Sequence, residues 1–265
     1  MREPDISIKR VFAIVAHPDD IEFMMAGTLC LLRDAGYEIH YMTVADGSLG
    51  SVQHDAPTIA AMRRQEAMAA AALLGAVYHE SICPDMGVFY DDATLRRLSA
   101  VVREVAPTIL LTHPPLDYME DHMNTCRLAL SAAFVRGAPN YVTAPPRPPV
   151  NTPVTIYHAM PYGLRTPLGQ PTQPDCYVDI TDVLPLKRQM LTMHRSQQAW
   201  LDVSQGVGAF VAHMERMSRE VGRLSGRFAY AEGWTRHLAL GYCGDDDDPL
   251  ADALGDRLLR AAVNE

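Results

Sequence analysis

The first half of the chain alternates short apolar runs with longer amphipathic stretches. The apolar runs have the length and composition of buried strands, and the amphipathic stretches have the apolar spacing of helices that cover a sheet. We predict strands at residues 10–16, 38–44, 76–82 and 108–112, and helices at residues 22–35, 58–74, 92–105 and 120–135. Because strands alternate with helices of this length in βαβ units, the pattern predicts an α/β fold with a Rossmann-like, mostly parallel sheet flanked by helices.

The second half is less regular. We predict strands at residues 154–158 and 176–180, and helices at residues 182–200 and 206–224. Residues 137–153 are rich in proline, which excludes a helix, and we interpret them as a long loop over the carboxyl end of the sheet rather than as an interdomain linker. The aspartates at 245–248 indicate a solvated, acidic C-terminal tail over residues 241–265, and we expect residues 1–265 to form one domain.

Polar side chains follow the first predicted strand directly. His17 comes after its last apolar residue, and Asp19, Asp20 and Glu22 follow closely. Open α/β sheets bind ligands at the carboxyl ends of their strands. A histidine and an aspartate this close together can hold one divalent metal, while the other aspartate stays free to accept a proton from water. A turn that caps the helix near Glu22 is the alternative, but a cap explains only one of these polar residues.

Residues 16–22 read Ala-His-Pro-Asp-Asp-Ile-Glu and resemble the signature of the LmbE/PIG-L family of metal-dependent N-deacetylases, Ala-His-Pro-Asp-Asp-x-Glu after the first strand. Further landmarks of the family are matched in order along the chain, and the resemblance thins beyond about residue 240. These landmarks are Arg63-x-x-Glu66, Leu74-Gly75, Asp85-x-Gly87, residues 117–122, residues 178–181, Lys187, His194-x-Ser196-Gln197 and Tyr230-x-Glu232. The resemblance implies the Rossmann-like fold of the family and hydrolysis of a small-molecule N-acyl substrate.

The resemblance also implies a metal site and a general base. His17, Asp20 and His122 match the metal ligands of the family, with Zn²⁺ as the expected ion and another divalent metal such as Fe²⁺ as the alternative. Asp19 matches the general base that activates water. We therefore predict a zinc-dependent N-deacetylase that removes an acetyl or short acyl group from a sugar-like or natural-product amine. A metal-dependent hydratase on the same scaffold and a metal-binding protein without catalysis are the alternatives.

Three further side chains are candidates for contact with the substrate. Arg63 matches an arginine that faces the pocket in family members, and a surface ion pair with Glu66 or a neighbouring residue is its alternative. Asp85 is placed to accept a hydrogen bond from a sugar hydroxyl, or else to form an Asp-Met-Gly turn. Tyr118 is a candidate catalytic residue that donates its hydroxyl to the developing oxyanion, or else an ordinary packed aromatic.

Position 119 departs from the family pattern. Many relatives have a second histidine three residues before the third ligand, whereas this chain has Met119, whose thioether can neither donate a hydrogen bond nor release a proton. His113 closes the fourth predicted strand, and we predict that it supplies the missing catalytic group; a bond to nearby backbone is the alternative. We expect Asp121 to orient His122, to cap the following helix, or both. Residues 194–197 are interpreted as structural.

Composition and charge limit the expected partners. The net charge of −9 provides no basic surface for nucleic acid and disfavours an anionic membrane. The polar N-terminus lacks a signal-peptide core, and no apolar run approaches the length of a membrane span. The five cysteines are scattered without a Cys-x-x-Cys pair, which is typical of reduced thiols, so we expect a cytoplasmic enzyme. Because family members are often oligomers, we also expect a homo-oligomer.

Overall fold

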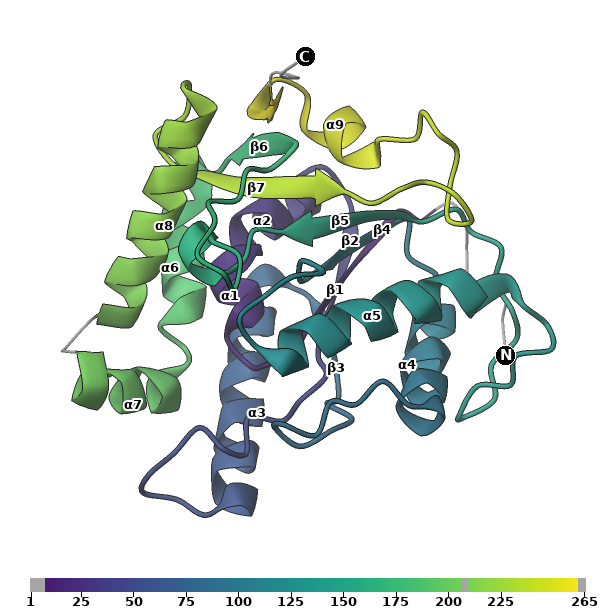
Figure 1. Cartoon of the computed structure of the whole chain (residues 1–265), viewed down its shortest axis with the longest axis horizontal. Helices are drawn as coiled ribbons and strands as arrows, with labels where there is room; N and C mark the ends of the chain where they lie inside the picture. The colour runs from purple at the N-terminus through teal and green to yellow at the C-terminus, as the bar shows by residue number, and fades with distance from the viewer. Residues whose placement is uncertain (1–7, 206–208, 262–265) are drawn as a thin grey trace.

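Within residues 8–205 and 209–261, which the computed structural model describes, one sheet of eight strands forms the centre of the molecule (Figure 1). The strands are β1 (Arg10–Val15), β2 (Glu38–Thr43), β3 (Val77–His79), β4 (Ile109–Thr112), β5 (Thr155–Ala159), β6 (Cys176–Asp179), β7 (Ala231–Arg236) and β8 (Leu258–Arg260). Their order is β3-β2-β1-β4-β5-β7-β6-β8. The strands from β3 to β5 are parallel, and the other three are antiparallel to their neighbours. The predicted α/β class and Rossmann-like winding are confirmed, with an antiparallel extension.

Helices cover both faces of this sheet. They are α1 (Asp20–Met24), α2 (Ala26–Asp34), α3 (Ala56–Leu74), α4 (Asp92–Val105), α5 (Glu120–Phe134), α6 (Leu184–Leu191), α7 (Arg195–Gln205), α8 (Ala209–Ser225) and α9 (Pro249–Leu254). In Figure 1, α5 crosses the near face of the central strands and α2 lies behind them. None of the described helices combines the length and apolarity that a bilayer span requires.

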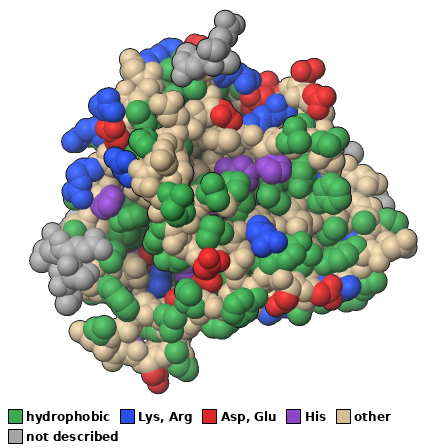
Figure 2. Space-filling view, in the orientation of Figure 1, with side chains coloured by type: hydrophobic (Ala, Val, Ile, Leu, Met, Phe, Trp, Pro, Cys, Tyr) green, Lys and Arg blue, Asp and Glu red, His purple; other side chains and the backbone are tan. Residues whose placement is uncertain are grey.

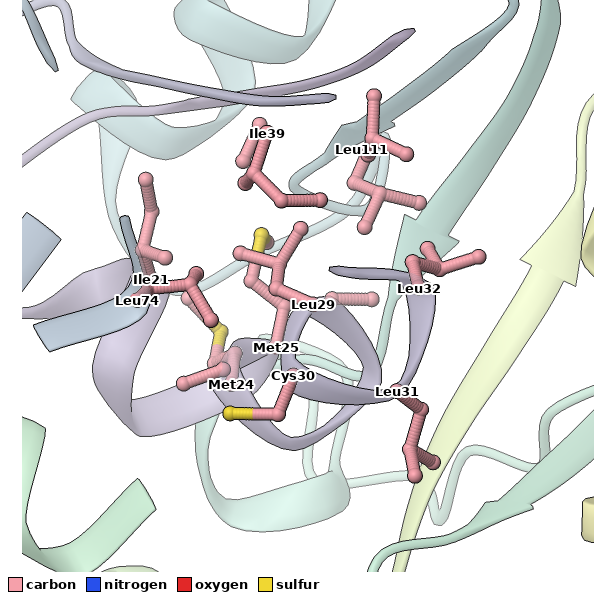
Figure 3. Packing of buried hydrophobic residues seen from close by; sticks show 14 of the residues in the cluster. Ile21, Met24, Met25, Leu29, Cys30, Leu31, Leu32, Ile39, Leu74 and Leu111 are labelled. Atoms are coloured by element: carbon pink, nitrogen blue, oxygen red, sulfur yellow. The ribbon is translucent and has the colours of Figure 1, made fainter. Parts of the chain in front are cut away.

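Alternate residues of β1 point to opposite faces, as the pleat of a strand requires. Val11, Ala13 and Val15 pack in a cluster with α1 and α2, and Phe12 and Ile14 pack in a second cluster with α4 and α5. Figure 3 shows the first cluster, where side chains of α1 and α2 lie against residues of β2 and β4. Because β1 is buried on both faces, the polar residues that follow it emerge from a rigid part of the sheet.

Local caps explain why α3 and α4 were predicted well. At the start of α3, Asp55 accepts a hydrogen bond from the Thr58 amide, and at its end Gly75 adopts a left-handed conformation. At the start of α4, Asp91 accepts a hydrogen bond from the Thr94 amide. The predicted bounds of α4 agree with those of the structure, and α3 begins two residues before its predicted start.

Two predicted helices are interrupted. The helix expected over residues 22–35 is divided into α1 and α2, because Met25 leaves the helical conformation. The helix expected over residues 182–200 is divided into a 3₁₀ turn at Thr181–Val183, α6 and α7, with His194 at the break between α6 and α7. The helix expected over residues 206–224 corresponds to α8, although the predicted start at 206–208 lies outside the described residues.

The C-terminal segment is not simply a solvated tail. Residues 245–247 are exposed, as expected, but Asp248 caps α9 and accepts a hydrogen bond from the Tyr157 hydroxyl at 2.6 Å. Leu250 is completely buried, and β8 pairs with β6. The tail prediction was wrong for this part because Asp248 caps α9 and anchors it to Tyr157.

The proline-rich segment 137–153 also lies elsewhere than predicted. It connects the end of α5 to the start of β5, and therefore passes the amino ends of the parallel strands. The Ala144 amide donates to the carbonyl of Arg96 in α4, and the Val150 amide donates to the carbonyl of Arg136. The segment packs beside α4 and α5, so the prediction of a loop over the carboxyl end was wrong.

Candidate active site

A pocket of about 280 Å³ opens at the carboxyl ends of β1 and β4. The loop after β1, the start of α5 and the loops after β2 and β3 converge there, as expected for an open α/β sheet. In Figure 2, a hollow in the lower left of the molecule exposes acidic, basic and histidine side chains close together. The pocket is lined by His17, Asp19, Asp20, Leu49, Gly50, Arg63, Asp85, Met86, Tyr118, Met119, His122, Gln197 and Trp200.

The three predicted metal ligands meet in this pocket. One potential ligand atom from each of His17, Asp20 and His122 lies within 4.8 Å of the other two. Asp20 Oδ2 is 3.5 Å from His17 Nδ1 and 3.5 Å from His122 Nε2. The structure thus brings together side chains that are separated by more than a hundred positions in the sequence, because the first βα turn and the start of α5 share one edge of the sheet.

A buried carboxylate holds the far ring nitrogen of each histidine. Asp121 Oδ2 lies 3.1 Å from His17 Nε2, and Asp117 Oδ1 lies 3.0 Å from His122 Nδ1. These bonds direct His17 Nδ1 and His122 Nε2 toward Asp20, which is the arrangement of carboxylate, histidine and metal in many metalloproteins. The expectation that Asp121 orients His122 was wrong: Asp121 holds His17, and Asp117 takes the expected role. Asp117 was missed, although it opens the segment 117–122.

The pKa shifts in the site reflect the carboxylates that surround its histidines. Burial lowers the pKa of His17, but hydrogen bonds with Asp121 and Asp20 outweigh it and raise the pKa to about 10. Burial lowers the pKa of His122 as well, and Asp20 and Asp117 raise it above its ordinary value. Burial favours the neutral form of Asp20, yet the three surrounding histidines hold its pKa well below the usual range. The site therefore stabilises positive charge, and a divalent cation would satisfy the same carboxylates.

Asp19 lies beside the ligands but does not form a helix cap. It occupies the position before α1 with φ 110° and ψ −25°, and its side chain accepts no capping hydrogen bond. Such a conformation is costly for a residue with a Cβ and is typical of functional sites. Burial raises the pKa of Asp19 to about 6, and the Arg63 guanidinium, 3.3 Å away, opposes the rise. The alternative of a simple Asp-rich cap is therefore wrong for Asp19.

Arg63 and Asp85 tie the loops of the pocket together. The buried guanidinium of Arg63 donates to the carbonyls of Pro18 and Gly47 as well as to Asp19. The two carboxylate oxygens of Asp85 accept hydrogen bonds from the backbone amides of Gly47 (2.6 Å) and Leu49 (3.0 Å). Both side chains line the pocket, and their contact with substrate stays a prediction.

The surface ion pair proposed as an alternative for Arg63 is not formed. Glu66 instead accepts hydrogen bonds from the amide of Ser196 at 2.9 Å and from its hydroxyl at 2.6 Å. This contact fastens the start of α7 to α3. It explains why Gln197 and Trp200, which the sequence analysis did not assign to the site, line the pocket.

Tyr118 and His113 both lie against the ring of His122. The Tyr118 side chain lines the pocket, and its ring stands edge-on to the His122 ring at 5.5 Å between centroids. Burial raises the pKa of Tyr118, so its hydroxyl keeps the proton at neutral pH. His113 is completely buried behind His122, stacked on it at 4.0 Å, and its Nε2 accepts a hydrogen bond from the Ala16 amide.

This position disfavours the catalytic role predicted for His113. Among the described residues, His113 is not part of the lining of the pocket. Burial lowers its pKa to about 4, so the imidazole is neutral near neutral pH and cannot act as a general acid there. The alternative of a histidine bonded to backbone describes the contact with Ala16, and His113 Nε2 also lies 3.3 Å from Asp20 Oδ2. His194, interpreted as structural, is also completely buried and lies 3.0 Å from Glu22, which accepts a hydrogen bond from Tyr41.

Comparison with known proteins places the chain in a family. The family model described as PIG-L: GlcNAc-PI de-N-acetylase matches residues 12–133. Diacetylchitobiose deacetylase from Thermococcus kodakarensis is 27% identical over 243 residues, which is 88% of this chain and 85% of the relative. 4-Oxalmesaconate hydratase from Pseudomonas putida is 30% identical over 250 residues, which is 85% of this chain and 88% of the relative. The chain belongs to the PIG-L family.

The PIG-L fold extends beyond the residues matched by the family model. The solved structure of N,N'-diacetylchitobiose deacetylase from Pyrococcus horikoshii, complexed with its inhibitor MPG, has a TM-score of 0.73 with this chain at 24% sequence identity. The match covers 94% of this chain and 91% of that chain. The two proteins therefore share a fold over nearly their whole length.

Proposed function

We propose that this PIG-L protein is a metal-dependent amidohydrolase that removes an acetyl or other short acyl group from an amine of a sugar-like or natural-product substrate. The observation that carries the proposal is the position of Asp19. Its carboxylate lines the same pocket as His17, Asp20 and His122, makes no helix cap and has a pKa of about 6. The alignment with diacetylchitobiose deacetylase over 88% of the chain supports this reaction.

The donor set fits a divalent ion such as Zn²⁺ or Fe²⁺. Two imidazole nitrogens and one carboxylate oxygen are ligands that these ions accept, and Asp117 and Asp121 fix the orientation of the two rings. When bound by His17, Asp20 and His122, the ion supplies Lewis acidity and lowers the pKa of water.

Asp19 acts first as base and then as acid. As a carboxylate it accepts a proton from the attacking water, and as a carboxylic acid it returns that proton to the amine that leaves. A pKa of about 6 suits both tasks, because the group is mostly ionised at neutral pH and still holds a proton briefly once it has accepted one. Arg63 holds the carboxylate in place from α3.

Tyr118 is the candidate partner for the carbonyl oxygen of the amide. Negative charge develops on that oxygen when water attacks, and a fixed hydroxyl donor lowers the barrier. The raised pKa of Tyr118 keeps its proton available for this bond. With Asp19 and Tyr118 in these roles, the reaction requires no histidine at position 119.

The pocket favours a substrate without net charge. Its described lining contains the carboxylates of Asp19, Asp20 and Asp85 and a single guanidinium, Arg63, which already contacts Asp19 and two carbonyls. With a divalent cation added, the charges of the lining approximately cancel, so no surplus positive charge remains to attract a polyanion. A neutral N-acetylated sugar or a similar molecule does not depend on surplus positive charge for binding.

A hydratase is the second candidate. The Pseudomonas putida hydratase is 30% identical to this chain. Met119 departs from the family pattern at the position where the resemblance implies a histidine. Asp19 would serve this reaction as well, by activating water for addition to a carbon–carbon double bond.

Product analysis separates these two functions. Protein loaded with zinc or iron is incubated with N-acetylated amino sugars, cysteine conjugates and nucleoside antibiotics, and separately with 4-oxalmesaconate, and the products are measured by proton NMR. We expect equal amounts of acetate and free amine from at least one N-acetyl compound, with loss of activity on chelation. Hydration of the unsaturated acid without acetate from any N-acetyl compound would contradict the proposal and favour the second candidate.

A further inference from the structure

A second cavity adjoins the catalytic pocket and has no role in the reaction described above. It has a volume of about 370 Å³, larger than the catalytic pocket, and lies between α3, α7 and the loop that follows β2. We propose that this cavity is a subsite for an apolar alkyl or aromatic group on the amine portion of the substrate. The inference rests on the proposed amide hydrolysis and narrows its substrate class to N-acylated amines with an apolar substituent.

Trp200 joins the two cavities. Its side chain lines both of them. The loop after β2 is shared in the same way, because Gly50 lines the catalytic pocket and residues 51–54 line the second cavity. On α3, Arg63 faces the catalytic pocket while Met62 lines the second cavity. The two cavities therefore lie next to each other along α3 and α7 and share Trp200 as a wall; together we call them the groove (α3 and α7 are labelled in Figure 1).

The chemistry of the second cavity suits an apolar group. Its apolar wall consists of Val52, Ile59, Met62, Ala199 and Trp200. Val52 is 79% exposed and Met62 is 37% exposed, so apolar surface remains uncovered beside a polar catalytic pocket. The cavity is also bordered by the polar side chains of Gln53, His54, Arg195 and Glu66, and the Glu66 carboxylate is bonded to Ser196.

The direction of the groove assigns the apolar group to the amine side of the amide. Asp19 returns its proton to the leaving nitrogen, and Asp19 is paired with Arg63 of α3, so the nitrogen is expected on the α3 side of the pocket. Tyr118, the candidate partner of the carbonyl oxygen, stands against His122 and Tyr162 instead. The groove continues from the α3 side, toward which the amine substituent would extend.

The first test is a series of alkyl N-acetyl-β-D-glucosaminides with methyl, butyl and hexyl groups. We expect KM to fall about fourfold for each added methylene until the cavity is filled, because each buried methylene contributes about 0.8 kcal/mol, while kcat stays unchanged. Ala199→Phe fills the cavity and is expected to bring the hexyl-to-methyl ratio of kcat/KM close to one. The matched control is Ala69→Phe, on an exposed position of α3 outside both cavities, which should keep the wild-type ratio.

The second test measures binding without catalysis and therefore separates this inference from the proposed function. The chain has two tryptophans, and Trp234 is completely buried, so 1-hexanol in the cavity should change the fluorescence of Trp200. A saturable change in the wild type that is lost in Trp200→Phe and weakened in Ala199→Phe supports the subsite, even in a protein that releases no acetate. A fluorescence response that does not saturate, or a gain in kcat/KM from longer N-acyl chains rather than longer glycoside chains, would overturn it.

Discussion

Replacing Asp117 by Asn removes a buried charge while nearly preserving the shape of the side chain. Asp117 is completely buried, and its Oδ1 lies 3.0 Å from His122 Nδ1, which leaves Nε2 of that ring to face Asp20. Loss of such a supporting carboxylate weakens metal binding by about 10- to 100-fold. This corresponds to about 1.4–2.8 kcal/mol of binding free energy. We expect Asp117→Asn to show this loss of zinc affinity with the fold retained.

The assay is competition for zinc against a chelator of known affinity, with circular dichroism to verify folding. Asp121→Asn should weaken zinc binding similarly, because Asp121 supports His17 at 3.1 Å. Asp92→Asn is the matched control, since its exposed carboxylate pairs with Arg96 on the surface of α4. Wild-type zinc affinity in folded Asp117→Asn would refute the assignment of Asp117 as the support of His122.

Three further predictions concern stability, pH and assembly. Glu232→Gln should lower the free energy of unfolding in urea by about 3–5 kcal/mol, because it leaves Lys187 buried without its counter-charge at 2.6 Å; a loss below 1 kcal/mol would contradict this. Burial lowers the pKa of His158 in the folded protein to about 4. Between about pH 6.5 and pH 4 the unfolded chain therefore binds a proton at His158 that the folded chain does not bind, and the free energy of unfolding falls as the pH falls. Between pH 7 and pH 5, the free energy of unfolding of His158→Gln should therefore fall by about 2 kcal/mol less than that of the wild type. An equal fall in both proteins would contradict the lowered pKa of His158. Light scattering at micromolar concentration should detect a homo-oligomer, and a monomer would refute that expectation.

The regular part of the fold was predictable because local signals and long-range packing agree there. The apolar run of β1 is buried on both faces, and Asp55, Gly75 and Asp91 mark helix ends in the sequence itself. Strand β7 was missed because it contains Gly233 and the charged Glu232, whose burial depends on Lys187 and on the amides of α2. No local pattern reveals such a partner.

The candidate site, like the fold, could be predicted from the sequence only in part. His17, Asp20 and His122 could be predicted because the family motif names them and because strand ends of a parallel sheet meet at one edge. The pairing of each histidine with its carboxylate could not be predicted, since Asp117 and Asp121 lie in one short segment and the backbone at the start of α5 decides which ring each contacts. The approach of α7 to the pocket was equally hidden, because it depends on the bond between Glu66 and Ser196.

Zinc content and turnover, measured together in Asp19→Asn and Asp20→Asn, test the account most directly. Asp19→Asn should retain close to the wild-type zinc content, while acetate release falls by about two to four powers of ten, the usual contribution of a positioned base. Asp20→Asn should lose zinc, because its carboxylate faces both histidines at 3.5 Å. An Asp19→Asn protein that loses its zinc, or that keeps wild-type turnover, would contradict the division between base and ligand on which the proposed reaction rests.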